Sequence, residues 1–173
     1  MPTVDARDLE RFYTQSLDWT DCGIGKCTRV TVPVDYADPK GKTLELAIKV
    51  VPALGAGGRS LFLNPGGPGA SGIRFADYLA GKISPTVREH YDLVNVDPRG
   101  VGASTPVDCV SDAALAAFAA SDPDPDTPAE IKAFREEHRK LGEGCVRRSG
   151  AVAAHVSTEE VARDFDVLRA LLG

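Results

Sequence analysis

Two short apolar runs, each followed directly by a turn rich in glycine and proline, constrain the fold of this chain more than any other feature. Ser60–Leu63 (SLFL) enters Asn64–Gly72 (NPGGPGASG), which has four glycines and two prolines in nine residues, and Tyr91–Asp97 (YDLVNVD) enters the turn PRGVG. Short apolar runs bounded by such turns are typical of buried parallel strands. Because Ile73–Ala80 has a helical pattern, this segment predicts a strand–loop–helix–strand unit.

An antiparallel hairpin is expected before this unit, and helices are expected after it. Thr28–Val34 and Thr43–Val51 read as strands joined by the turn residues DYADPKGK. Four later helices are predicted. The first begins after the N-cap pair Ser84-Pro85, the second spans Asp112–Ala120, and the third runs from the capping box at Thr127 to about Arg147. The last runs from the capping box at Ser157 to Gly173 and has Val161, Phe165, Leu168 and Leu172 on one face. The predicted fold class is α/β, with residues 1–173 forming one domain or part of one.

Composition excludes several classes of partner. The 173 residues are 43% hydrophobic and 26% charged, with a formal net charge of -5 and no run of Lys and Arg. These values describe a globular chain and argue against nucleic acid or an anionic membrane as a partner. No apolar stretch approaches the ~18 residues of a membrane span, and residues 1–20 carry charges where a signal peptide is apolar. The protein is therefore expected either to stay inside the cell or to have lost a leader.

The four cysteines are Cys22, Cys27, Cys109 and Cys145, and their spacings match neither C-x-x-C redox pairs nor common zinc sites. An even number of cysteines without those spacings favours two disulfides. The expected pairs are Cys22 with Cys27 and Cys109 with Cys145. Four thiols in a cytosolic protein remain the alternative.

Two chemistries explain a loop as rich in glycine as Asn64–Gly72. Gly67, Gly69 and Gly72 satisfy the dinucleotide pattern G-x-G-x-x-G, whereas free glycine amides also form oxyanion holes in acyl-transfer enzymes. A tight turn without a ligand is the third interpretation. The dinucleotide hypothesis is disfavoured because Pro68 has no N–H, because the hairpin precedes the loop, and because Asp97 stands 25 residues after Gly72.

The motifs NPGGPG, at residues 64–69, and DPRGVGAS, at residues 97–104, resemble the α/β-hydrolase superfamily. Within it they are similar to the prolyl and tripeptidyl aminopeptidase branch, especially the secreted actinobacterial tripeptidyl aminopeptidases. The resemblance extends from about Cys22 to Gly173. It implies that the chain is the N-terminal half of an α/β-hydrolase core, in which an antiparallel hairpin leads into parallel strands with flanking helices.

The resemblance also implies roles for individual residues. The backbone N–H of Gly67 is expected to be one of two oxyanion-hole donors. The residues expected to shape and support the loop are Asn64, Pro65, Gly66, Pro68 and Gly69. The turn that braces the loop from below is expected to use Asp97, Arg99, Gly100 and Gly102, with Gly100 and Gly102 permitting the bend.

The catalytic triad of that branch cannot be assembled from this chain. The nucleophile elbow G-x-S-x-G is absent, since Ser71 lies in GASG and Ser104 lies in GASTP. His90, His138 and His155 have the sequence surroundings of solvated or helix-capping residues. The nucleophile, the acid, the histidine and the substrate-selecting cap are expected beyond residue 173. The chain alone is therefore expected to be inactive, and a second polypeptide or a missing C-terminal part is expected to complete it.

Three functions remain open on these grounds. The first is part of a serine aminopeptidase that acts on free peptide N-termini, the second is an esterase or other small-molecule hydrolase of the same fold, and the third is a non-catalytic half that binds a partner chain. No cofactor and no metal are expected. The paired cysteines and the resemblance favour secretion or the cell envelope over the cytoplasm.

Overall fold

The computed structural model describes residues 6–173, which divide into two compact units. The first unit contains the sheet and comprises the described residues up to Pro106 together with His155–Gly173. Its elements are α1 (Ala6–Tyr13), β1 (Thr20–Cys22), β2 (Gly25–Pro33), β3 (Thr43–Val51), β4 (Arg59–Leu63), α2 (Gly72–Ala80), α3 (Pro85–His90), β5 (Tyr91–Asp97) and α7 (Thr158–Leu172). Residues 1–5, at the start of the segment considered for a signal peptide, lie outside the described residues.

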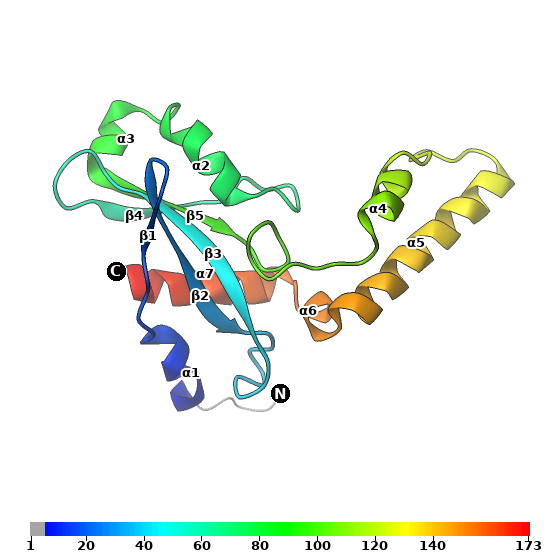
Figure 1. The fold of residues 1–173 in the computed structure, drawn as a ribbon, viewed down its shortest axis with the longest axis horizontal. Helices are drawn as coiled ribbons and strands as arrows, with labels where there is room; N and C mark the ends of the chain where they lie inside the picture. The colour runs from blue at the N-terminus through cyan, green and yellow to red at the C-terminus, as the bar shows by residue number, and fades with distance from the viewer. Residues whose placement is uncertain (1–5) are drawn as a thin grey trace. The chain divides into compact units, whose positions relative to one another are not determined.

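One five-stranded sheet organises the first unit, in the order β1-β2-β3-β5-β4 (Figure 1). The pairs β1–β2, β2–β3 and β3–β5 are antiparallel, and β4–β5 is parallel. The connection from β4 to β5 runs through α2 and α3, as a parallel pair requires. The two strands that end in glycine-rich turns, β4 and β5, are therefore neighbours. Because they are parallel, both turns follow the carboxyl ends of the strands at the same end of the sheet.

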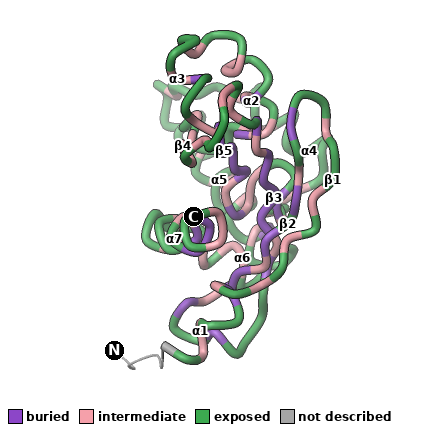
Figure 2. Tube along the Cα trace, turned by 90° about the vertical axis from the view of Figure 1, so that its left-hand side faces the viewer, coloured by how far each residue is buried: buried purple, intermediate pink, exposed green. Residues whose placement is uncertain are grey.

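Helices cover both faces of this sheet. On one face, Leu93 and Val51 pack with Ala76 of α2, and the half-buried Leu61 and Leu63 lie against this cluster. On the other face, the ring of Phe62 meets Phe165 of α7 with the ring centroids 5.8 Å apart. The alternation of Leu61, Phe62 and Leu63 between the faces is the period of two that a strand imposes. Figure 2 shows the buried residues concentrated along β2, β3 and β5.

The two edges of the sheet differ in how their backbone groups are satisfied. Beside β2, the side-chain amide of Gln15 accepts a hydrogen bond from Thr31 N and donates one to Thr31 O, both at 2.9 Å. Gln15 thus takes the place of a neighbouring strand at that point. At the opposite edge, β4 pairs only with β5 among the described residues. The outer backbone groups of β4 therefore have no strand partner in this part of the chain.

The second unit, residues 107–154, is helical. It comprises α4 (Asp112–Ala119), α5 (Pro128–Ser149) and α6 (Ala151–Ala154). No residue of α4 is buried, and in α5 only Gly144 is. This unit has too little buried apolar surface to be held together by packing alone.

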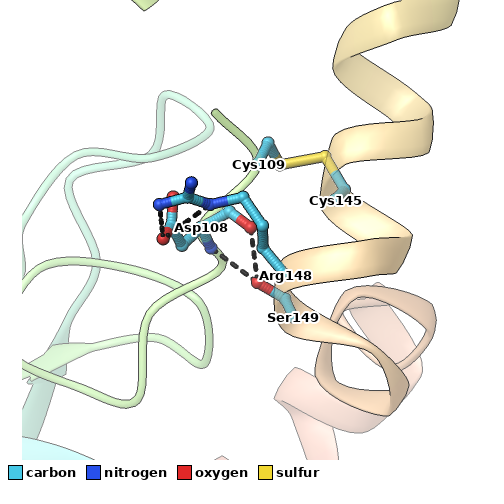
Figure 3. The surroundings of a disulfide bond; sticks show 5 residues. All are labelled: Asp108, Cys109, Cys145, Arg148 and Ser149. Atoms are coloured by element: carbon cyan, nitrogen blue, oxygen red, sulfur yellow. Dashed lines mark hydrogen bonds and ion pairs between the residues drawn. A yellow bond between two sulfur atoms is a disulfide. The ribbon is translucent and has the colours of Figure 1, made fainter. Parts of the chain in front are cut away.

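A disulfide between Cys109 and Cys145 connects the entry segment of the second unit to α5 (Figure 3). Beside it, Arg148 donates two hydrogen bonds to Asp108 Oδ2, and Ser149 Oγ bonds both the N–H and the C=O of Asp108. Gly144 permits this close approach, because a Cβ there would lie 2.1 Å from the carbonyl oxygen of Cys109. Covalent and polar contacts therefore replace a hydrophobic core.

The expected elements are present, with boundaries shifted by a few residues. The hairpin, the two later strands and the helices after Ser84, Ser111, Thr127 and Ser157 are confirmed, as are both disulfides. No sequence pattern predicted α1, β1, α6 or the division into two units. No helix among residues 6–173 is long and apolar enough to cross a membrane.

We predict that the Cys109→Ser/Cys145→Ser double variant opens the second unit. The disulfide closes a separation of 36 residues, which corresponds to about 4 kcal/mol of stabilisation in the chain-entropy model. Limited proteolysis followed by mass spectrometry should show new early cleavage within 107–154. The matched control is Cys22→Ser/Cys27→Ser, which removes a separation of only five residues and should leave that region protected. Equal cleavage of 107–154 in wild type and in the Cys109/Cys145 variant would contradict the prediction.

Candidate functional site

The glycine loop after β4 presents backbone amides to solvent. Gly66, Gly67 and Gly69 have φ values of 81°, 126° and 96°, a region that favours glycine. Residues 66–70 are exposed. Asn64 Oδ1 accepts a hydrogen bond from Gly66 N at 3.2 Å, so the expected orienting side chain acts within the loop itself.

Three amides of this loop are left unpaired. Within the described part of the chain, the N–H groups of Gly67, Gly69 and Ala70 donate to no protein acceptor. A Cβ at Gly67 would lie 2.9 Å from Gly69 N and 3.0 Å from Ala70 N, so a side chain there would crowd the other two amides. Pro65 and Pro68 contribute no N–H and restrict the backbone on either side. Clustered unpaired amides of this kind attract an anionic oxygen.

Asp97 holds the loop in place from below. Its Oδ1 accepts hydrogen bonds from Ser71 Oγ at 2.7 Å and from Ile73 N at 3.1 Å, and its Oδ2 accepts from Ala103 N at 2.8 Å. The side chain is only 1% exposed. One carboxylate thus connects the end of the loop, the first turn of α2 and the turn after β5.

This position of Asp97 also decides against a dinucleotide site. In such a site the N-terminus of the helix after the glycine loop binds the pyrophosphate. Here the carboxylate of Asp97 already lies at the N-terminus of α2, where it accepts from Ile73 N, and Ser71 Oγ accepts from Arg74 N. A second anion at the same place would meet a negative charge instead of free donors.

Two glycines allow these segments to approach one another. A Cβ at Gly72 would lie 2.2 Å from the carbonyl oxygen of Val96, and one at Gly102 would lie 2.1 Å from Asp97 Oδ2. Gly102 and Gly100 have φ values of 58° and 84°, which the sharp turn requires. Any larger residue at position 72 or 102 would push α2 or the turn away from the sheet.

Ser104 is a structural residue of this turn. It is 2% exposed, and its Oγ donates to the carbonyl oxygen of Asp97 at 2.5 Å and accepts from Ala47 N at 2.8 Å. Thr105 continues the pairing, since its N–H donates to Glu45 O and its Oγ1 accepts from Glu45 N. Both serines weighed from the sequence, Ser71 and Ser104, are therefore committed to hydrogen bonds around Asp97.

Arg99 anchors the other side of the turn. Its guanidinium forms a bidentate ion pair with Asp164 of α7, with Nε–Oδ2 at 2.8 Å and Nη2–Oδ1 at 2.7 Å. It also donates to the carbonyl oxygens of Pro33, Val34 and His155. The ion pair is almost fully buried, with side-chain exposures of 0% and 3%. Arg99 thus connects β5 to the hairpin and to α7, a role distinct from that of Asp97.

Asp164, Arg99 and Tyr36 shift one another's pKa values, because both partners donate hydrogen bonds to the Asp164 carboxylate. Burial raises the pKa of the Asp164 carboxyl, and the hydrogen bonds from Arg99 and Tyr36 offset part of that effect. Tyr36 Oη donates to Asp164 Oδ1 at 2.8 Å, and burial beside this carboxylate raises the pKa of Tyr36. For Arg99, burial acts to lower the pKa, but the contacts with Asp164 outweigh it and raise the pKa. The geometry is that of a charge pair with its hydrogen-bonding capacity filled.

The three histidines lie apart from the glycine loop in their contacts. His138 bonds Phe134 O and lies between the rings of Phe118 and Phe134 on the second unit. His155 contacts Glu160 and faces Asp35, and His90 ends α3. None of them contacts Ser71 or Ser104 in the described residues.

Asp164 and Tyr36 were not among the residues predicted from the sequence, although both belong to the buried network around Arg99. Asp164 lies on the buried face of α7 together with Val167 and Leu168, so the predicted stripe through Phe165 and Leu168 was displaced from the true centre. An acidic residue on an apolar helix face was the available signal, because a buried charge requires a partner such as Arg99.

Comparison with known proteins shows extended similarity to bacterial hydrolases. The chain is 40% identical over 169 residues to the tripeptidyl aminopeptidase of Streptomyces lividans, 41% identical over 156 residues to carboxylesterase B of Mycobacterium tuberculosis, and 40% identical over 181 residues to the serine protease Hip1 of the same species. The matches cover 91%, 88% and 97% of this chain but only 32%, 30% and 35% of those proteins. No family model matches.

These similarities confirm the resemblance drawn from the glycine loop and the Asp-Pro-Arg-Gly turn. The chain spans about a third of the length of the curated relatives it matches. It is thus similar along nearly its whole length to one portion of proteins named as peptidases, a protease and an esterase.

We predict that Asp164→Ala lowers the free energy of unfolding of the first unit by about 3–5 kcal/mol, because Arg99 would remain buried without its partner. Urea denaturation followed by circular dichroism measures the change. Glu159→Ala on the same helix removes an exposed i,i+4 pair with Arg163 and should cost under about 1 kcal/mol. A cost for Asp164→Ala no larger than that of Glu159→Ala would show that the pair is not buried as described.

Proposed function

We propose that this chain is the oxyanion-binding part of a serine hydrolase, with an aminopeptidase acting on free peptide N-termini as the preferred activity. The observation that carries the proposal is the exposed, unpaired N–H of Gly67 beside those of Gly69 and Ala70. Unpaired amides on a rigid loop are the groups that stabilise the negative oxygen of a tetrahedral intermediate. The similarity to a tripeptidyl aminopeptidase and to a serine protease supports the same class of chemistry.

In this proposal the residues of the chain act by position. The N–H of Gly67 donates to the substrate carbonyl oxygen as it becomes an oxyanion, and the missing side chain leaves room for it. The hydrogen bonds of Asp97 to Ser71 and Ile73 hold the end of the loop before substrate binds. The loop therefore does not need to reorganise as charge develops, and the loss of one such donor lowers the rate by ~10²–10³.

We propose that the nucleophile, acid and histidine come from a further part of the protein. Ser71 and Ser104 are committed to structural hydrogen bonds, and relatives are about three times as long as this chain. The outer edge of β4 offers the attachment point, since a strand added there would pair with Arg59–Leu63 and continue the sheet. Residues 1–173 are then the N-terminal half of one α/β-hydrolase domain.

An esterase of the same fold is the second candidate. The similarity to a protein named carboxylesterase B, at 41% identity, favours it as directly as the peptidase names favour the first. Oxyanion stabilisation is common to ester and peptide cleavage, so the loop does not distinguish them. Parallel assays on peptide and ester substrates separate the two, whereas a protein that hydrolyses neither is the non-catalytic binding half.

We also propose that the protein acts outside the cytoplasm. All four cysteines are paired in disulfides. Cys22–Cys27 closes a short loop, and Cys109–Cys145 links two segments of the weakly packed second unit. Disulfides persist in oxidising compartments.

We predict that Gly67→Ala in the complete enzyme lowers kcat by about 10²–10³ because the added methyl group crowds the oxyanion donors. Steady-state kinetics on aminoacyl, tripeptidyl and ester chromogenic substrates measures the effect. Gly57→Ala is the matched control, because Gly57 also has a positive φ, 74°, but has nothing within 4 Å of its Cβ position. It imposes similar backbone strain away from the loop and should leave kcat unchanged.

The isolated 173-residue chain is the second arm of this experiment and should show no turnover. Turnover by the isolated chain that is lost in Ser71→Ala or Ser104→Ala would contradict the assignment of the nucleophile to another segment. Equal kcat in Gly67→Ala and wild type, with unchanged melting temperatures, would contradict the oxyanion role.

A further inference from the structure

Three side chains that the proposed hydrolase chemistry does not use lie close together, next to the hydrogen bond between Arg99 and the His155 backbone. Asp35 follows β2 in the hairpin turn, His155 precedes α7, and Glu160 lies in the first turn of α7. Each offers one ligand atom, and these atoms lie within 4.8 Å of one another. The backbone of His155 is fixed in this position because its carbonyl oxygen accepts from Arg99 Nη1 at 2.9 Å.

Glu160 orients the imidazole of His155. Glu160 Oε2 accepts from the N–H and the Oγ of Ser157, and Oε1 lies 2.5 Å from His155 Nδ1. Glu160 acts as an acceptor in its contacts with Ser157, and its short contact with His155 therefore places a proton on Nδ1.

This tautomer leaves the other imidazole nitrogen with a lone pair. His155 Nε2 faces Asp35 Oδ2 at a distance of 4.0 Å. The other oxygen of Asp35 is occupied, since Oδ1 accepts from Ala37 N at 2.7 Å. In this neutral tautomer, two acceptor atoms face each other without a protein donor between them in the described residues. Such a gap takes a cation.

The dimensions suit a small divalent metal ion. Zinc lies about 2.0–2.1 Å from histidine nitrogen and about 2.0–2.2 Å from carboxylate oxygen, so two atoms on one ion can be at most about 4.2 Å apart. Tetrahedral coordination shortens that separation to about 3.4 Å. Asp35, with a side chain that is 39% exposed, can close the difference by a small rotation.

The charges around the gap also favour a cation. Asp35 and Glu160 place two carboxyl groups beside the imidazole of His155. The positive charge of Arg99 is balanced by its ion pair with Asp164, and the guanidinium of Arg163 lies over the ring of Tyr36. A histidine that donates its second N–H to a carboxylate is the usual arrangement at metal sites, where that carboxylate orients the ligand.

We propose that His155 Nε2 and Asp35 Oδ2 bind a divalent transition-metal ion of the zinc type, with Glu160 Oε1 orienting the imidazole and water completing the coordination. The ion connects the hairpin turn to the start of α7, next to the contacts that Arg99 makes with the same two segments. Its role is structural, and it is independent of the proposed hydrolase activity. The cysteines do not compete for the metal, because all four are in disulfides.

Zinc chloride titration of the purified, oxidised chain by calorimetry tests the site. We expect one ion per chain at neutral pH and a rise in melting temperature that EDTA reverses. Asp35→Asn keeps an oxygen for Ala37 N but removes the charged ligand, and it should weaken binding at least about tenfold, as should His155→Gln. Glu160→Gln retains both ligands and should weaken binding by about 10–100-fold through loss of orientation.

His138→Gln is the matched control, because His138 is exposed on α5 and contacts no carboxylate within residues 6–173. The His138→Gln variant should bind zinc with the same affinity as wild type. Binding of Co²⁺, followed by its visible absorption, should report nitrogen and oxygen ligands and should disappear in Asp35→Asn and His155→Gln. The proposal fails if wild type binds no zinc at micromolar concentrations, or if Asp35→Asn and His155→Gln, folded by circular dichroism, bind it as tightly as wild type.

Discussion

The arrangement of the glycine loop depends on one buried carboxylate, that of Asp97. It accepts hydrogen bonds from Ser71, Ile73 and Ala103, which lie in the glycine loop, in the first turn of α2 and in the turn after β5. A buried charge persists only where its hydrogen-bonding capacity is filled. Because these donors satisfy Asp97, the loop, the first turn of α2 and the turn after β5 are held as one body, and the loop amides face solvent without needing internal partners.

Some backbone N–H and C=O groups outside the strand pairs are hydrogen-bonded by side chains, whereas others have no partner among the described residues. Gln15 replaces a missing strand beside Thr31, and Ser104 and Thr105 extend the pairing of β3 beyond the end of β5. In contrast, the loop amides around Gly67 and the outer edge of β4 have no partner among the described residues. These groups lie on exposed or half-buried segments, so they are accessible to an incoming partner. The two open places are therefore where we place a substrate oxygen and a further strand.

Arg99 organises the opposite side of the same turn through Asp164 and three carbonyl oxygens. The contact with the carbonyl oxygen of His155 has a second effect, because it fixes the backbone from which that imidazole extends beside Asp35. The turn DPRGVGAS thus connects two separate places in the first unit. Asp97 supports the loop of the proposed hydrolase, and Arg99 supports the cluster to which we assign the metal ion.

The sequence by itself predicted most of the local elements, favoured the two disulfide pairs and indicated the loop as the candidate site. These depend on signals read within a few residues, namely apolar runs, capping boxes at Thr127 and Ser157, and glycines where φ must be positive. The tertiary structure alone decided the partners of the buried charges. Arg99 and Tyr36 reach Asp164 across 65 and 128 residues of chain. No local pattern encodes such a contact, because it depends on how the chain returns to the sheet. The same holds for Gln15 beside Thr31 and for His155 beside Asp35.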